Sequence, residues 1–517
     1  MTTTRYDVVI LGGAFSGASA AILLRREHPQ LRVLVVEKAE AFDAKVGEAT
    51  TEMSAMFLTR RLAMWEHLER EHLPKEGLRY WFTNEKVSCH ADASESGGVV
   101  RSLVPSFQLR RDVLDEHLLA TAVAEGADLV RPGRVKDVSL GSFDQRVTVE
   151  AADGNQTIEC RWVLDATGRA CYLGKRLGLI DRNEEHPTAA IWCRWTNVRH
   201  IDDVAARGPL PFARGNVGSR RLGTNHYMGF GYWIWFIPLG NGETSIGVVF
   251  DKRYVDLHLS RDRARDYVGF LQAIPPAAEL LDRASMQEGD LRFYGSLPYV
   301  TRQYMGPGWA LLGDAAAFLD PYYSPGLDHA AFSVEATVTL IGKEAAGEVI
   351  TPLIEEHNRT FVRSYHRFFR AAYRDKYTYM GEHDLLSAAF LLDTAHYYIF
   401  VVIPAYRLFG RFHWMPVFGP SEAFASYHLM QFYNRRFRRI ALERRRIGVE
   451  GLRNNGRRIN AFFNLDLAPF RMLARGLKLW LFAELDLLRL RFSRRPAIST
   501  SSESAPTTMT SKTGDSR

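Results

Sequence analysis

The sequence predicts an α/β fold in which a doubly wound βαβ unit is followed by a mixed β-sheet region and a largely helical C-terminal region. Three observations predict this order. Residues 6–38 alternate between buried-strand and helix patterns. Residues 191–250 are rich in aromatic and β-branched side chains. From about residue 352 to 495 the strand patterns nearly vanish, and apolar residues recur at helical spacing.

The composition is that of a globular chain with more than one structural unit. Of the 517 residues, 46% are hydrophobic and 24% are charged, which argues against wholesale disorder. The four cysteines form no CxxC pair, so we expect a reducing compartment and no metal site. The net charge of +7 allows an acidic partner without requiring one. The start has no signal-peptide cleavage region, and the apolar run Thr394–Tyr406 is too short to span a bilayer, so we expect a cytoplasmic protein.

The first elements follow from local patterns. Tyr6–Leu11 is a continuous apolar strand, Ser16–Arg26 an alanine-rich helix, and Leu31–Val36 a second buried strand. Arg111–Ala127 has apolar residues at helical spacing and predicts a helix. Val147–Val163 predicts a hairpin, because two strand-like runs flank a short polar turn.

The later elements suggest how the chain is divided. Ile191–Phe250 predicts mostly sheet, and Trp309–Leu312 predicts a buried strand that precedes a helix from about Gly326. We therefore expect three parts: a first module over residues 1–350 with its substrate sheet at about 180–300, a helical region over 351–495, and a disordered Ser/Thr-rich tail over 496–517.

A glycine-rich turn joins the first strand to the first helix. It fits the GxGxxG spacing, with Ala14 at the position of the middle glycine. Gly12 allows the tight turn, the backbone at Gly13 and Ala14 approaches a pyrophosphate, and Gly17 lets the helix pack on the strand. Helix N-terminal amides then face the phosphates. Glu37 ends the next strand, where an acid binds a ribose hydroxyl, so the turn predicts a dinucleotide site.

Three later segments favour FAD over NAD. Arg111 opens the segment RDVLD, Asp165–Gly168 reads DATG at a strand end, and Asp314 lies in the segment LGDAA between an apolar strand and a helix start. Each resembles a segment of hydroxylase-type flavoproteins, in which the arginine lies near the dinucleotide and the aspartate hydrogen-bonds the ribityl chain of the flavin. The predicted fold is therefore an FAD-binding doubly wound βαβ fold.

Three motifs resemble those of the flavin-dependent halogenases and follow that family's order. They are Val46–Thr50 (VGEAT), Trp233–Pro238 (WxWxIP) and Phe318–Gly326 (FxxPxxSxG, directly after GDAA). The resemblance covers about residues 6–350. It implies FAD as FADH2, chloride or bromide as co-substrate, and three further cofactor contacts: Glu48, Pro321 and Gly326.

The resemblance also implies two separate sites within one protein. In this family hypohalous acid forms near reduced FAD and travels to a substrate pocket, where a lysine presents it to an electron-rich ring. Trp233 and Trp235 would form an indole barrier between the two sites. The barrier keeps the substrate ring away from the flavin, which favours halogenation over hydroxylation. The family pattern FKxGxxF compares with the segment PKEGLRY, whose lysine is Lys75. The neighbouring Lys45 and Lys86 lack the following glycine. An ammonium in an apolar pocket offers three donors, and burial lowers its pKa.

The loop after GDAA departs from the family at two positions. Tyr323 takes the place of a glutamate that positions or deprotonates the ring in tryptophan halogenases, which suits the branch acting on phenols, pyrroles or carrier-bound acyl groups. Pro325 has no N–H, so a halide would rely on the amide of Gly326, together with Ser324. His329 follows closely, either as a base beside the flavin or as a packed structural residue.

The C-terminal helices are rich in arginine. Asn434–Ile447 holds seven arginines, and Phe470–Phe492 is amphipathic. The plain interpretation is a helix laid over the flavin domain with a solvated outer face. Sharper interpretations are docking of an acidic acyl carrier protein or peripheral contact with an anionic membrane. Nucleic acid is not expected, because no reader motif accompanies the charge.

Together these patterns predict an enzyme of secondary-metabolite biosynthesis. It would carry out FADH2- and O2-dependent halogenation of an electron-rich aromatic substrate through hypohalous acid and a catalytic lysine. A separate NAD(P)H-flavin reductase would supply FADH2, since no second nucleotide fold is visible. The alternatives are an FAD-dependent monooxygenase or double-bond oxidoreductase on the same fold, and a non-catalytic flavin-bearing scaffold that binds a carrier protein.

Overall fold

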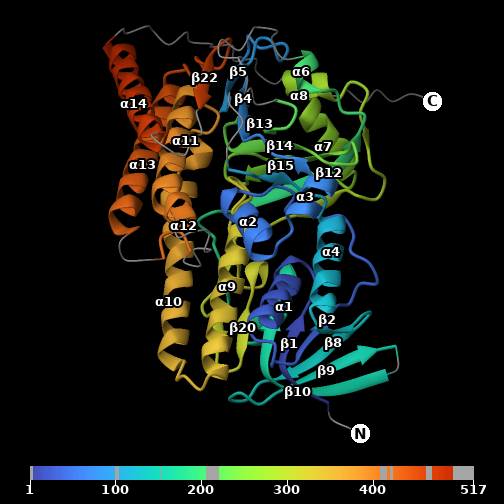
Figure 1. Cartoon of the computed structure of the whole chain (residues 1–517). Coiled ribbons are helices and arrows are strands. Elements are labelled where there is room, and N and C mark those ends of the chain that lie inside the picture. The colour runs from blue at the N-terminus through green and yellow to red at the C-terminus, as the bar shows by residue number, and fades with distance from the viewer. Residues whose placement is uncertain are drawn as a thin grey trace, which may run out of the picture.

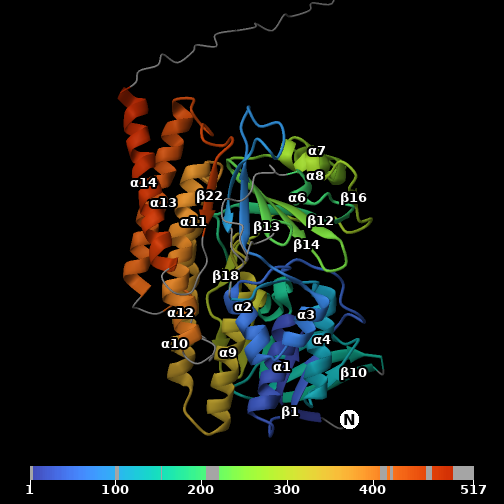
Figure 2. The same cartoon turned by 45° about the horizontal axis from the view of Figure 1, so that its top comes forward.

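The computed structural model describes residues 4–98, 104–152, 154–204, 220–407, 416–419, 423–461 and 468–492. Figure 1 shows an N-terminal α/β layer, a second sheet placed beyond it, and the helices after residue 350 along one flank. The turned view in Figure 2 keeps the last helices on that same flank, beside the second sheet. The predicted disordered tail at 496–517 lies outside the described residues.

The first layer is built on the predicted βαβ unit. Strands β1 (Thr4–Leu11) and β2 (Val33–Val36) are parallel neighbours joined by helix α1 (Phe15–Glu27). Strand β10 (Gly154–Asp165) pairs in parallel with the other edge of β1, and β20 (Trp309–Leu311) pairs in parallel with β10. The α/β prediction and both predicted strands of the unit are thus confirmed.

The rest of this sheet is partly antiparallel. Strand β9 (Gln145–Ala151) pairs antiparallel with β10, which confirms the predicted hairpin. Helix α4 (Arg111–Ala124) confirms the helix predicted from apolar spacing over Arg111–Ala127, and it packs on α1. The eight-stranded sheet is completed by β7 (Asp128–Val130), β8 (Arg134–Ser139) and β19 (Met305–Gly306).

The second sheet has nine strands and forms a wall of the cavity described below. Its central order is β12 (Thr188–Thr196), β15 (Thr244–Asp251), β14 (Tyr232–Pro238), β13 (Thr224–Gly229) and β4 (Leu78–Phe82). Most of these strands fall in the predicted sheet region, and the outer ones are β5 (Ser94–Gly98), β16 (Ser285–Met286), β17 (Arg292–Tyr294) and β22 (Arg458–Ala461).

Short elements connect the two layers. Helices α2 (Glu52–Met56) and α3 (Trp65–Glu71) precede the second sheet, and α7 (Arg263–Gln272) and α8 (Pro275–Leu280) cover its far side. The others are α5 (Tyr172–Arg176), α6 (Ile201–Val204), β3 (Leu73–Pro74), β6 (Phe107–Gln108), β11 (Ile180–Arg182), β18 (Tyr299–Thr301) and β21 (Ala317–Phe318).

The C-terminal region is largely helical, as predicted. Helix α9 (Gly326–Ala345) precedes this region, whose helices are α10 (Thr351–Phe368), α11 (His383–Tyr397), α12 (Ile403–Arg407), α13 (Phe424–Arg446) and α14 (Ala468–Phe492). No strand was predicted in this region, yet β22 joins the second sheet in parallel beside β5. Four residues are too few for an alternating pattern to stand out. The three-part division of the chain remains a proposal.

One continuous helix, His383–Tyr406, is long and apolar enough to cross a membrane. The run Thr394–Tyr406, predicted to be too short to span a bilayer, forms the C-terminal part of this helix, because it continues α11 through a π-helical turn at Tyr398–Val402. However, 72% of its most apolar stretch is buried inside the fold, where α11 packs mainly against α14. These features are those of a core helix, and the cytoplasmic location remains a prediction.

Several arginines of the C-terminal helices are held in internal ion pairs. Arg436 bridges α13 to Glu484 of α14, and the buried Arg444 pairs with Glu382 and Asp384 beside α11. These pairs fix the helices to one another, which supports the plain interpretation of the arginine-rich segment. Contact with a membrane or an acidic carrier protein remains a prediction.

Candidate active site

A cavity of about 1020 Å³ lies between the first layer, the second sheet and the C-terminal helices. Of the fifteen site residues expected from the sequence, all but Gly13 and Gly17 line it: Gly12, Ala14, Glu37, Glu48, Lys75, Arg111, Trp233, Trp235, Asp314, Pro321, Tyr323, Ser324 and Gly326. Motifs up to 314 residues apart in sequence, from Gly12 to Gly326, thus meet around one space.

The glycine turn is shaped for a close backbone approach. Gly12 has φ +99°, and a Cβ there would lie 2.7 Å from the carbonyl oxygen of Ala166. A Cβ on Gly17 would lie 1.9 Å from the oxygen of Gly12, so the turn and the start of α1 require glycine. The Glu37 carboxylate accepts hydrogen bonds from the amides of Gly13 and Ala39, each at 2.8 Å, and still faces the cavity. This arrangement fits a pyrophosphate and a ribose.

Three charged side chains line the cavity beyond this turn. Arg111 reaches the loop at Val46 with a hydrogen bond of 3.2 Å and is held by Asp115 on the next turn of α4. Desolvation raises the pKa of Asp314, which lies in the GDAA loop three residues after the end of β20. Burial also raises the pKa of Glu48 to about 7, against the opposing pull of Ser245 and of nearby arginines. Donors and carboxylates in these places suit the polar chain of FAD.

The WxWxIP motif places its indoles on the cavity side of β14. Alternation along the strand sends Trp233, Trp235 and Ile237 to the cavity, while Ile234 and Phe236 enter a separate core on the other face. Both indoles are buried, with ring centroids 5.7 Å apart.

Each indole is fixed by its own hydrogen bond. Trp235 Nε1 donates to Ser245 Oγ at 3.1 Å, and its ring occupies the space left by Gly247, where a Cβ would lie 2.1 Å from it. Trp233 Nε1 donates to the hydroxyl of Tyr377 at 2.9 Å, and that hydroxyl donates to Asp320 at 2.8 Å. Because Asp320 directly precedes Pro321, the indole is tied to the loop that follows GDAA.

Lys75 is buried in the same cavity, with 7% of its surface exposed. Its Nζ donates to the carbonyl oxygen of Thr50 at 2.7 Å. Burial lowers its pKa to about 8, although the carboxylates of Glu52 and Asp328 oppose the shift. Lys86, by contrast, is exposed. The lysine chosen by the motif is therefore a desolvated cation with N–H donors available.

The loop before α9 holds two residues in an unusual conformation. Tyr323 and Ser324 have φ values of +71° and +56°, which lie in the left-handed region that residues other than glycine rarely adopt. Such strain is often found at functional sites. Pro325 and Gly326 follow at the open N-terminus of α9 and line the cavity. The cavity thus meets the positive end of a 20-residue helix.

His329 and His226 are neutral members of the wall. Desolvation lowers the pKa of His329 to about 4, and its ring hydrogen-bonds the hydroxyl of Tyr304 at 3.2 Å. His226 stacks on Tyr80 at 5.2 Å between centroids, and burial lowers its pKa to about 3. For His329, these contacts favour the structural interpretation over a role as base.

Sequence reasoning missed several residues of this site. Tyr377 and Asp393 come from helical segments without any motif. The packing of the C-terminal helices brings Asp393 to the cavity wall and Tyr377 behind it, against Trp233. Asp320 lies inside FxxPxxSxG, but at a position that the motif leaves open. His226 occupies β13, where the alternation that points it inward was visible in principle.

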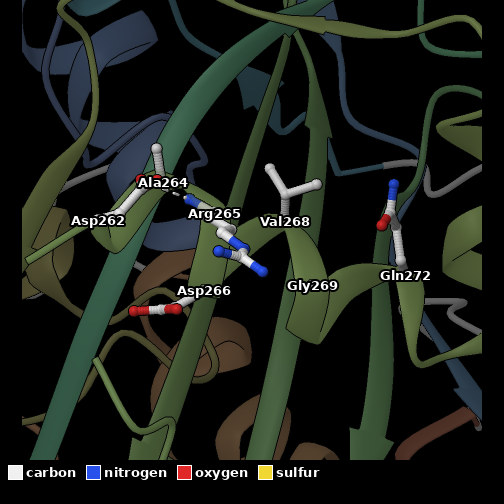
Figure 3. A pocket seen from close by; sticks show the side chains of 7 residues that line it. All are labelled: Asp262, Ala264, Arg265, Asp266, Val268, Gly269 and Gln272. Atoms are coloured by element: carbon white, nitrogen blue, oxygen red, sulfur yellow. Dashed lines mark hydrogen bonds between the residues drawn. The ribbon is translucent and has the colours of Figure 1, made fainter. Parts of the chain in front are cut away.

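A second hollow lies on the outer side of α7, and its side chains are drawn in Figure 3. Asp262 caps the helix by accepting from the amide of Arg265 at 3.1 Å, so its carboxylate serves the fold locally. This hollow shares no lining residue with the large cavity. Among the described residues, no group of three or more His, Cys, Asp or Glu side chains is arranged to hold a metal ion.

A glycine turn on a doubly wound sheet, a GDAA loop at its edge and a second sheet over the cavity define an FAD-dependent oxidoreductase. The family model for tryptophan halogenase matches residues 7–91 and 63–375 of the chain. The chain therefore belongs to the tryptophan halogenase family, whose relatives are flavin-dependent halogenases that use FAD and a halide. The predicted family, fold class and enzyme class are confirmed.

Three named relatives show how much of the chain is similar to other halogenases. The chain is 28% identical over 466 residues to the flavin-dependent halogenase chlA of Dictyostelium discoideum, covering 82% of this chain and 74% of that protein. It is 26% identical over 438 residues to the 1H-pyrrole-2-carbonyl-[peptidyl-carrier protein] chlorinase of Pseudomonas fluorescens, covering 79% and 88%. The match to tryptophan 2-halogenase of Chondromyces crocatus covers 66% of this chain and only 62% of that protein, at 26% identity.

Solved structures share the fold. Halogenase PltM in complex with phloroglucinol and FAD has a TM-score of 0.70 at 18% identity, covering 94% of this chain and 98% of that one. The chondrochloren halogenase CndH has a TM-score of 0.62 at 20% identity, covering 73% and 83%. Because the first similarity extends over nearly the whole chain, it includes the helical C-terminal region.

Proposed function

We propose that this enzyme halogenates an electron-rich aromatic ring, with hypohalous acid as the travelling oxidant and Lys75 as the catalytic lysine. The observation that carries the proposal is the burial of the Lys75 ammonium in the cavity that Trp233 and Trp235 line. A buried cation beside an apolar aromatic wall has a function to perform, since most lysines remain solvated.

Reduced FAD and dioxygen, when bound, supply the oxidising power that converts a halide into hypohalous acid. The residues of the chain then have separate tasks. The indoles of Trp233 and Trp235 keep the organic ring away from the flavin side. Lys75 donates hydrogen bonds to the oxidant oxygen on the substrate side and so makes the halogen more electrophilic.

The halide would bind at the N-terminus of α9. Pro325 removes one amide from this end, so the proposal relies on the amide of Gly326 with Ser324 beside it. The positive end of the helix favours an anion there.

The substrate class is proposed from Tyr323 and from the relatives. A tyrosine, instead of a carboxylate, next to Ser324 suits a phenol, a pyrrole or a carrier-bound acyl group better than free tryptophan. The relative that chlorinates a carrier-bound pyrrole and the fold neighbour that holds phloroglucinol have rings of these kinds. A separate flavin reductase would provide FADH2.

A flavoprotein monooxygenase or double-bond oxidoreductase is the competing proposal on the same fold. The test is to supply purified protein with FADH2 from an added reductase, dioxygen, bromide and a panel of phenols and pyrroles, with mass detection of products. We expect brominated products and, with a small β-diketone trap, oxidised bromide. Hydroxylated or reduced products without bromine would instead support the competitor.

The pH dependence follows from Lys75. Its ammonium is the form that donates hydrogen bonds, and it loses its proton near pH 8 instead of near the ordinary 10.5. We expect turnover to fall about tenfold per pH unit above pH 8, for a substrate whose own hydroxyl does not titrate in this range. Between pH 8 and pH 10.5 this lysine is protonated more often in the unfolded chain than in the folded protein. The contribution of Lys75 to the free energy of unfolding therefore rises with pH over this range. A loss of turnover that tracks unfolding would contradict the assignment.

A further inference from the structure

We infer that a buried network of Tyr323, Asp393 and Lys376 binds the hydroxyl group of a phenolic substrate, with Tyr323 in contact with that hydroxyl and Asp393 as the positioning residue behind it. This inference deepens the proposed function and rests on it, because it selects a phenol from the proposed substrate classes. It is carried by contacts between the loop after GDAA and the C-terminal helices.

Helix α11 brings Asp393 to the cavity wall. Phe390, Thr394 and Tyr397 of the same helix also line the cavity, so this face of α11 forms part of the pocket. Asp393 is 6% exposed. A carboxylate buried this deeply requires partners, because its desolvation is costly.

The carboxylate of Asp393 has three donors. Tyr323 Oη donates to Oδ2 at 2.9 Å, and Tyr433 Oη from α13 donates to Oδ1 at 2.6 Å. The ammonium of Lys376 forms an ion pair with Oδ2 and has no exposed surface. The Lys376–Asp393 ion pair therefore lies within the wall itself and gives the carboxylate a partner that does not come from outside.

The geometry leaves Tyr323 ready to accept a further hydrogen bond. Its hydroxyl proton is committed to Asp393, and its oxygen accepts from Lys376 Nζ at 3.2 Å. A hydroxyl oxygen has two acceptor sites, so one remains for a donor in the cavity. Burial and the nearby carboxylate raise the pKa of Tyr323 well above its ordinary value, so it remains a neutral phenol. A neutral oxygen polarised by a carboxylate is suited to a ligand O–H.

The network has a front that lines the cavity and a back that lies behind the cavity wall. Tyr323 and Asp393 line the cavity, whereas Lys376 and Tyr433 do not. The left-handed conformation of Tyr323 places a strained residue at the front. A purely structural ion pair would not need this polar front, and apolar residues of similar size can replace such a pair at little cost. A hydrogen bond from the substrate O–H to Tyr323 would also raise the electron density of the ring at the ortho and para carbons.

The test compares resorcinol with its dimethyl ether as substrates for bromination. Tyr323→Phe removes the acceptor oxygen, and Asp393→Asn removes the charge behind it. We expect either variant to raise KM for resorcinol by roughly 10- to 100-fold, with little change for the ether. Tyr379→Phe is the matched control, because it removes a buried hydroxyl that bonds Asn434 and does not line the cavity.

A double variant, Lys376→Met with Asp393→Leu, distinguishes a loss of substrate binding from a loss of folding. It removes both charges of the ion pair and so leaves no unpaired buried charge. It should fold and show the same selective loss for resorcinol. An equal loss for both substrates, or no loss for resorcinol, would overturn the inference and leave only a structural role. A wild-type enzyme that brominates both substrates with equal KM would overturn it as well, while a wild-type enzyme that brominates nothing would instead refute the proposed function.

Discussion

Replacing Lys75 with methionine is expected to lower the rate of halogenated product formation by roughly 10²–10⁴-fold, the range in which one positioned proton donor contributes. Methionine keeps the approximate length of the side chain but has no N–H donor. Among the described residues, the hydrogen bond that this change removes is the one from Nζ to the carbonyl oxygen of Thr50. Product formation with FADH2, dioxygen and bromide would be followed by chromatography with mass detection.

Two controls isolate the role of this lysine. FAD binding, followed by the flavin spectrum, and release of oxidised bromide to a small trap should both stay at wild-type levels. Lys86→Met is the matched variant, since Lys86 lies eleven positions along the chain and is exposed. If Lys75→Met and Lys86→Met gave the same product yield, the catalytic assignment of Lys75 would be wrong.

Gly17→Ala is expected to weaken FAD binding. The added Cβ would lie 1.9 Å from the carbonyl oxygen of Gly12, and a backbone atom cannot yield as a flexible side chain can. The turn must shift, at a cost of about 1–3 kcal/mol. Because FAD binding requires the original shape of the turn, this cost should lower FAD affinity by roughly 10- to 100-fold. Titration with FAD, followed by fluorescence quenching, measures the loss.

The matched control is Gly269→Ala in α7. Gly269 is also a helical glycine, but its added Cβ meets nothing within 4 Å. This change should leave FAD affinity unaltered and raise the free energy of unfolding by about 0.5–1 kcal/mol, because alanine favours the helix. Unchanged FAD affinity in Gly17→Ala would contradict the assignment of the glycine turn.

The first layer of the fold could be predicted because its signals are local. The apolar strand before Gly12, the alanine-rich helix after it and Glu37 at the next strand end are neighbours in sequence, and parallel pairing follows from the βαβ connection. Resemblance to the family's motifs selected Lys75, Trp233 and Trp235, and the structure brings all three to one cavity.

The back of the site could not be predicted, because it depends on contacts between distant segments. Tyr377 holds Trp233 across 144 positions, and Asp393 holds Tyr323 across 70. No local pattern marks either residue, and helical periodicity explains each as ordinary core. Strand β22 was missed for a related reason, since its partner β5 lies more than 350 positions earlier.

The central claim is that the indole wall separates the oxidant's origin from the aromatic ring, so that a halide carries the oxidising power across. Turnover under ¹⁸O-labelled dioxygen with bromide and a phenol measures this most directly, by the mass of the product. The account predicts a brominated phenol without the oxygen label, because the labelled atom leaves as water. A product that carries the label in a new hydroxyl group would mean that the ring reaches the flavin itself, and it would contradict the account.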